Sequence, residues 1–167
     1  MPRIDQGVNE TRFMVVPRTL IFIFDNRGRV LLLKGSPGKR IWANLYNGIG
    51  GHVEPGEDIL GAAKRELTEE TGLTDVPLRF CGQIMVDVGD LTGVAIFIFR
   101  GTYQGNKFVE SEEGSLDWVD LAGINKLPVV EDLPHILPKI AAHRQGDPII
   151  IGHYRYQPDD TLKISLG

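Results

Sequence analysis

The side chains of this chain best suited to chemistry are glutamates that follow a glycine-rich segment. Four glutamates lie between residues 57 and 70 with one arginine among them: Glu57, Arg65, Glu66, Glu69 and Glu70. Like charges one helical turn apart repel each other, so the cluster favours a bound cation. Carboxylate oxygens are the ligands of Mg²⁺ and Mn²⁺, and Mg²⁺ bridges carboxylates to substrate phosphates. The pattern predicts a divalent-metal site, with a solvated acidic helix face as the alternative.

A helix after Gly51 is expected to position these side chains. No proline interrupts residues 57–70, and apolar residues recur at helical spacing on one face. This predicted buried face consists of Leu60, Ala63 and Leu67. Gly72 suits the left-handed C-cap of a helix. Glu66 and Glu70 are then one turn apart with Glu69 between them, within an arc of roughly 100°.

The spacing of these residues carries a family resemblance. Gly51, five residues, Glu57, seven residues, then Arg65-Glu66-Leu67, one residue, Glu69-Glu70, one residue and Gly72-Leu73 fill every defined position of the Nudix signature. The chain therefore resembles the Nudix hydrolases. The resemblance implies an α/β/α sandwich around a mixed β-sheet. It also implies hydrolysis, dependent on Mg²⁺ or Mn²⁺, of a nucleoside diphosphate linked to another group.

The same resemblance implies roles for individual residues. Metal ligands would come from Glu66, Glu69, Glu70, the carbonyl of Gly50 and Glu113. Glu113 belongs to the acidic stretch 110–113, whose other interpretation is solvated loop charge. Glu57 and Glu69 would hold further metal or orient Arg65, whose planar fork restricts the glutamate rotamers. The general base remains open among Glu66, Glu69 and Glu113.

A narrower similarity concerns the substrate. Asn47-Gly48-Ile49-Gly50-Gly51 resembles a stretch of the MutT-like Nudix enzymes that hydrolyse oxidised purine nucleoside triphosphates, in which the Asn binds the purine. An amide offers both a donor and an acceptor, which suits a purine edge. Glu131 and Asp132 would supply the paired acidic residues at the base. Asp132 has a second interpretation, as the cap of a helix beginning at Leu133 with Glu131 in solvent.

Two further substrate contacts are expected. The position that carries a stacking aromatic residue in that subgroup is Val129 here, so stacking would come from Trp42 or Tyr46. Lys34 is a candidate phosphate partner at the end of a strand, with simple solvation as the alternative.

The expected function is hydrolysis of a purine nucleoside triphosphate, such as 8-oxo-dGTP, to the monophosphate and pyrophosphate, which would cleanse the nucleotide pool. Metal would neutralise the phosphates and help to deprotonate water. Another Nudix substrate is the first alternative: ADP-ribose, a dinucleotide or a pterin triphosphate. A non-catalytic nucleotide sensor is the second, and retention of every signature glutamate argues against it.

Composition limits the partners and the compartment. The 167 residues match one domain, and a net charge of −4 offers no basic field for a nucleic-acid polymer. The single cysteine, Cys81, excludes an intramolecular disulfide and a cysteine zinc cluster. Apolar runs are too short to cross a bilayer, so no membrane association is expected. The predicted protein is cytoplasmic and acts on a small nucleotide.

The order of predicted elements places a Nudix domain at residues 1–145, with a loose arm at 1–12, and a C-terminal hairpin at 146–167. Predicted strands are 19–24 and 30–33 around a turn at Asn26 and Gly28, then 78–88, 94–99 (a central strand) and 117–119, and a helix is predicted at 133–143. Alternation in the C-terminal hairpin predicts one buried face, composed of Tyr154, Tyr156, Leu162 and Ile164. This face would pack on the domain or on a second subunit as a homodimer.

Overall fold

A computed structural model describes residues 2–7, 11–38, 41–89, 91–109 and 111–167. In these residues one mixed sheet has the strand order β3-β2-β1-β5-β4-β7-β8, and β6 pairs with β2. The strands are β1 (Met14–Phe24), β2 (Arg29–Gly35), β3 (Tyr46–Asn47), β4 (Arg79–Asp87), β5 (Thr92–Thr102), β6 (Gly114–Asp120), β7 (Ile150–Tyr156) and β8 (Leu162–Leu166). The helices are α1 (Ile59–Thr71) and α2 (Leu133–Ala142), with 3₁₀ turns η1 (Arg3–Gln6) and η2 (Leu121–Lys126).

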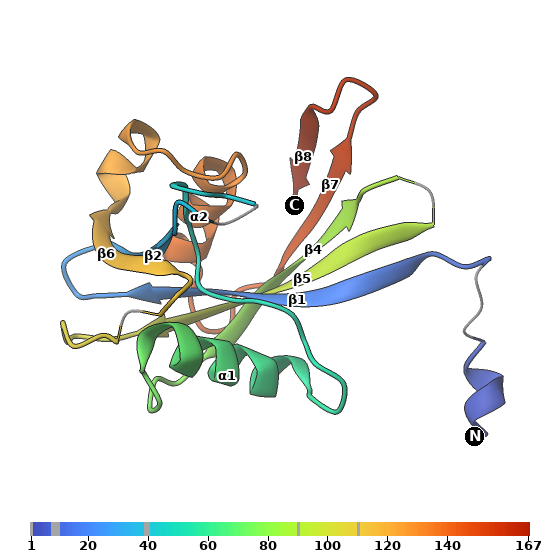
Figure 1. The fold of residues 1–167 in the computed structure, drawn as a ribbon, viewed down its shortest axis with the longest axis horizontal. Coiled ribbons are helices and arrows are strands. Elements are labelled where there is room, and N and C mark those ends of the chain that lie inside the picture. The colour runs from blue at the N-terminus through green and yellow to red at the C-terminus, as the bar shows by residue number, and fades with distance from the viewer. Residues whose placement is uncertain (1, 8–10, 39–40, 90, 110) are drawn as a thin grey trace.

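The two α-helices cover opposite faces of the sheet (Figure 1). On the α1 face, Ile21 and Ile23 of β1 pack with Leu67 in one apolar cluster. On the other face, Phe22 belongs to a second cluster with Ile136 of α2. Alternate residues of β1 therefore serve different layers, as the two-residue period of a strand requires. The predicted α/β/α sandwich with a mixed sheet is confirmed.

The predicted hairpin and the predicted central strand are both present. β1 pairs antiparallel with β2, and the turn between them contains Gly28 with a φ of 78°. β5 lies between β1, to which it is parallel, and β4, to which it is antiparallel. Burial on both faces explains why the sequence of β5 reads as a continuous apolar run.

Helix α1 has a defined cap at each end. The Asp58 carboxylate accepts hydrogen bonds from the N–H groups of Leu60 and Gly61 at 2.9 and 2.7 Å. Gly72 adopts the predicted left-handed C-cap with a φ of 73°. The prediction that Leu60 is buried is wrong, because Leu60 is 37% exposed. The residues that face the sheet are instead Ile59, Ala63 and Leu67, which follow one another at intervals of four residues. Leu60 does not belong to this series.

Helix α2 begins at the predicted residue, but the predicted side-chain cap is absent. Asp132 occupies the N-cap position, and its backbone carbonyl accepts from the N–H groups of His135 and Ile136 at 3.0 and 3.1 Å. Its side chain makes no capping hydrogen bond. The carboxyl group is therefore available for other contacts. No helix in the described part of the chain is long and apolar enough to span a bilayer.

The C-terminal hairpin continues the sheet. β7 pairs parallel with β4, and β8 pairs antiparallel with β7. Tyr154 is 2% exposed, as predicted, but Tyr156 is 47% exposed. The last register pair of β7 with β4 joins Arg155 to Asp87, so Tyr156 lies beyond the neighbouring strand that would cover it. At the other terminus, η1 falls within the predicted arm, whereas residues 1 and 8–10 lie outside the described residues.

Removal of residues 146–167 should destabilise the whole domain. The truncation would uncover the edge of β4 and the apolar cluster around Ile84, to which Tyr154 contributes. We expect a lower midpoint of thermal unfolding by circular dichroism and more aggregation, because an open apolar edge strand pairs with other chains. The control is Tyr156→Ala, a change at an exposed residue of the same hairpin. An unchanged midpoint for the truncated chain would contradict this view.

Candidate active site

One cleft, of about 480 Å³, brings together seven of the predicted functional residues. They are Trp42, Asn47, Gly50, Glu66, Glu70, Glu113 and Asp132. Five other predicted residues do not line it: Lys34, Glu57, Arg65, Glu69 and Glu131. Of these, Arg65 connects Glu57 and Glu69 to the lining residue Glu66, whereas Lys34 and Glu131 have other surroundings, described below.

The glycines before α1 allow its carboxylates to approach the backbone closely. A Cβ atom added to Gly51 would lie 2.4 Å from Glu66 Oε1, and one added to Gly50 would lie 2.2 Å from the Thr19 carbonyl oxygen. The Gly50 N–H donates to Glu70 Oε2 at 3.1 Å, and the Thr19 N–H donates to the Gly51 carbonyl at 2.8 Å. Both glutamates are thus held against a loop that is itself paired with β1.

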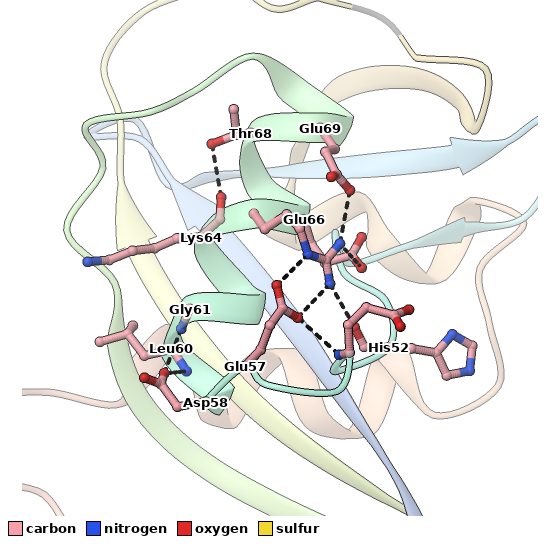
Figure 2. A network of polar contacts seen from close by, with 11 residues as sticks. His52, Glu57, Asp58, Leu60, Gly61, Lys64, Glu66, Thr68 and Glu69 are labelled. Carbon is pink, nitrogen blue, oxygen red and sulfur yellow. Dashed lines mark hydrogen bonds and ion pairs between the residues drawn. The ribbon is translucent and has the colours of Figure 1, made fainter.

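Arg65 joins three of the four glutamates of the cluster, and Figure 2 labels these three: Glu57, Glu66 and Glu69. Its Nε and Nη2 groups donate to the two oxygens of Glu57 at 2.7 and 3.0 Å. Its Nη1 group donates to Glu66 at 2.9 Å and to Glu69 at 3.0 Å. A further bond runs from Nη2 to the His52 carbonyl at 2.9 Å. One guanidinium therefore offsets the repulsion among three carboxylates and orients them.

The environment shifts the pKa values of two of these carboxyl groups in opposite directions. Hydrogen bonds from Arg65, then the hydrogen bond with Glu54, lower the pKa of Glu57 to about 2. Burial raises the pKa of Glu66, and the nearby charges of Glu69 and Glu57 add to this effect against the opposing influence of Arg65. Burial therefore disfavours the charged form of Glu66, which a cation in the cleft would favour.

The donor atoms at this end of the cleft suit a hard divalent cation. Glu66, Glu70, Glu113 and the Gly50 carbonyl offer only oxygen, the element that Mg²⁺ and Mn²⁺ prefer. Glu70 is only 5% exposed, and the Gly50 N–H that donates to it holds its carboxylate in place. Among the described residues, no three His, Cys, Asp or Glu side chains are already gathered around a single metal position.

The cleft also has apolar lining residues and a few polar groups besides the glutamates. Leu20, Ile96 and Trp42 all line it, and Trp42 is 46% exposed. The Asn47 side-chain oxygen accepts from the Gly48 N–H at 2.7 Å, which leaves the amide NH₂ group as a donor for a ligand. Asp132 supplies a carboxyl group whose pKa is raised by burial, an effect that its own backbone N–H partly opposes. Such a combination fits a flat heteroaromatic ligand with polar edges.

Several sequence expectations for substrate contacts have no counterpart in the cleft. Glu131 borders a separate groove with His135 and Lys139, so Glu131 and Asp132 do not act on one ligand from the same side. The Lys34 ammonium lies 5.7 Å from the centre of the Tyr46 ring. The Tyr46 hydroxyl donates to Asp117 at 2.8 Å. Of the two predicted stacking residues, Trp42 lines the cleft and Tyr46 does not.

Sequence reasoning missed the contribution of β1 to the cleft. Arg18, Thr19 and Leu20 all line it, as does His52, for which no chemical role was expected. The Thr19 hydroxyl is buried and has no hydrogen-bond partner among the described residues. No local pattern marks these residues, because their place depends on the pairing of β1 with residues 49–52.

The chain is similar to known proteins along most of its length. The NUDIX domain model matches residues 14–140. The oxidized purine nucleoside triphosphate hydrolase of Mus musculus is 32% identical over 145 residues, which cover 86% of this chain and 88% of that protein. The protein of the same name from Danio rerio is 39% identical over 102 residues, or 60% and 62% of the two chains. The crystal structure of a MutT protein from Bacillus halodurans has a TM-score of 0.74 and 26% identity, covering 91% of this chain and 97% of that one.

Replacement of Thr19 by valine should stabilise the ligand-free protein. The change removes a buried hydroxyl that lacks a partner among the described residues and keeps the branched shape. We expect the free energy of unfolding in urea to rise by about 1 kcal/mol. The matched control is Thr102→Val, at an exposed position of β5. A loss of stability in Thr19→Val alone would show that the hydroxyl has a structural role.

The Glu57 carboxylate should make the protein sensitive to acid. Its folded pKa, about 2, lies below the ordinary value of 4.5, so the unfolded chain binds more protons between these values. The free energy of unfolding therefore falls as the pH drops from about 4.5 towards 2. Glu57→Gln should flatten this dependence in urea denaturation at a series of pH values, whereas Asp75→Asn, at an exposed carboxyl group, should not. Equal slopes for Glu57→Gln and the parent protein would contradict the assignment.

Proposed function

This chain belongs to the Nudix hydrolase family, and from that premise we propose that it hydrolyses a purine nucleoside triphosphate to the monophosphate and pyrophosphate. The observation that carries the proposal is a single cleft lined both by the carboxylates of α1 and by an amide, an indole and apolar side chains. The carboxylates suit metal-bound phosphates, and the other groups suit a purine. The name of the mouse relative, which aligns along most of both chains, supports an oxidised purine as substrate.

At the phosphate end, the proposed ligands of Mg²⁺ or Mn²⁺ are Glu66, Glu70, the Gly50 carbonyl and Glu113. When bound, the ion would neutralise charge on the phosphates and lower the pKa of a bound water molecule. The chain's own contribution is to hold these oxygens in place, through the Gly50 N–H on Glu70 and through Arg65 on Glu66. Glu69 lies outside the cleft lining, which favours Glu66 or Glu113 over Glu69 as the general base.

The proposed contacts to the purine base combine polar groups with apolar side chains. The Asn47 amide would donate to an acceptor on the purine edge, and the Trp42 indole would stack on the ring. Asp132, whose pKa is raised by burial, would bring its carboxyl group to a polar edge of the base. Leu20 and Ile96 would exclude water from the ring faces.

A substrate panel tests the reaction directly. With Mg²⁺ or Mn²⁺, 8-oxo-dGTP and dGTP should yield pyrophosphate rather than phosphate, whereas ADP-ribose and NADH should be poor substrates. Removal of metal with a chelator should abolish turnover, and added metal should restore it. Hydrolysis of ADP-ribose alone would reject the purine triphosphate assignment and favour another Nudix substrate. Binding of all four without hydrolysis would favour a nucleotide sensor.

Replacement of Glu70 by glutamine tests the proposed metal site. Glutamine keeps the size of the side chain and an acceptor for the Gly50 N–H, but it removes the charge. We expect kcat/KM at limiting Mg²⁺ to fall by roughly 100-fold or more, with partial recovery at high Mg²⁺. The control, Glu112→Gln, changes an exposed carboxylate outside the cleft. Full activity of Glu70→Gln at limiting Mg²⁺ would exclude Glu70 as a required ligand.

A further inference from the structure

We propose that Arg18, oriented by His52, binds the terminal phosphates of the nucleotide. This inference rests on the proposed function and adds a phosphate-binding residue to it. Neither residue belongs to the glutamate cluster, and both line the cleft.

The charge of the cleft creates the need for such a residue. Five carboxyl groups line it: Glu54, Glu66, Glu70, Glu113 and Asp132. Arg18 is the only lysine or arginine among the described lining residues. A divalent ion at Glu66 and Glu70 would offset charge near the scissile bond, but a triphosphate carries further charge beyond that point. A guanidinium is well suited to phosphate because its planar fork donates two hydrogen bonds at once.

The contact between Arg18 and His52 prepares the guanidinium for a ligand. The two residues face each other in an isolated antiparallel bridge, and Arg18 Nε donates to His52 Nε2 at 3.1 Å. Because a guanidinium has no acceptor, the His52 ring must present a lone pair at Nε2. The contact uses only Nε–H, and within the described residues the Nη groups of Arg18 make no hydrogen bond or ion pair. With Nε engaged by His52, the two Nη groups remain to form a fork on phosphate.

The position of Arg18 along β1 matches the expected direction of the nucleotide. Arg18 precedes Leu20 by two residues, so both side chains lie on the same face of the strand, about 7 Å apart. Leu20 lies beside Gly48 at the base end. Arg18 lies beside His52, one residue after Gly51, against which Glu66 rests. A nucleotide with its base on Leu20 would therefore extend its phosphates past Glu66 towards Arg18.

The test combines kinetics with binding of inorganic tripolyphosphate. Arg18→Gln should raise KM for the nucleoside triphosphate about tenfold or more with a smaller change in kcat, because the contact lies beyond the bond that breaks. In calorimetry with Mg²⁺, it should weaken tripolyphosphate binding to a similar extent but leave binding of the nucleoside monophosphate unchanged. Arg18→Lys should recover part of the loss. The matched control is Arg27→Gln, which removes the same charge at an exposed turn.

The role of His52 is tested by its own variants. His52→Ala should raise KM less than Arg18→Gln does, because the guanidinium remains but loses its orientation, and His52→Gln should restore an acceptor and part of the affinity. Unchanged KM and unchanged tripolyphosphate binding in Arg18→Gln would overturn the inference, as would a lower unfolding midpoint without a change in either. If the parent protein hydrolyses no purine triphosphate, the proposed function fails, and tripolyphosphate binding still decides the role of Arg18.

Discussion

The close contact between the carboxylates of α1 and the glycine-rich loop is the constraint on which the site depends. Glu66 lies where any side chain at residue 51 would stand, and Glu70 accepts a hydrogen bond from the backbone of Gly50. Three negative charges on two turns of helix would otherwise repel each other. Arg65 offsets that repulsion from behind, so the cleft side of Glu66 remains open to a ligand.

Strand β1 connects this contact to the rest of the fold. Its odd-numbered residues face α1 and its even-numbered residues face α2, and at Thr19 and Leu20 the two sets meet at the cleft. Glu66 and Glu70 of α1 thus reach the cleft from one layer of the sandwich, and Leu20 reaches it from the other. A single central strand, paired with the 49–52 segment, sets the distance between them.

The sequence predicted what depends on local pattern. Helix α1, its cap at Gly72 and the β1–β2 hairpin follow from short-range periodicity and turn chemistry. Arg18 and Thr19 could not be found in this way, because strand residues reach a site through pairing with distant segments. Asp132 also shows how far local pattern reaches. The start of α2 at this residue was predictable, but the surroundings of its buried carboxyl group depend on tertiary packing near Tyr154.

The features that make the cleft useful also make it costly for the ligand-free protein. Glu66 is partly buried with a raised pKa, and the Thr19 hydroxyl is buried with no partner among the described residues. Each would be better satisfied by a cation or a polar ligand than by the protein alone. Ligand binding should therefore stabilise the fold, since it supplies partners that the unfolded chain does not need. Such a trade between stability and function is expected where a site is built for charges that arrive with the substrate.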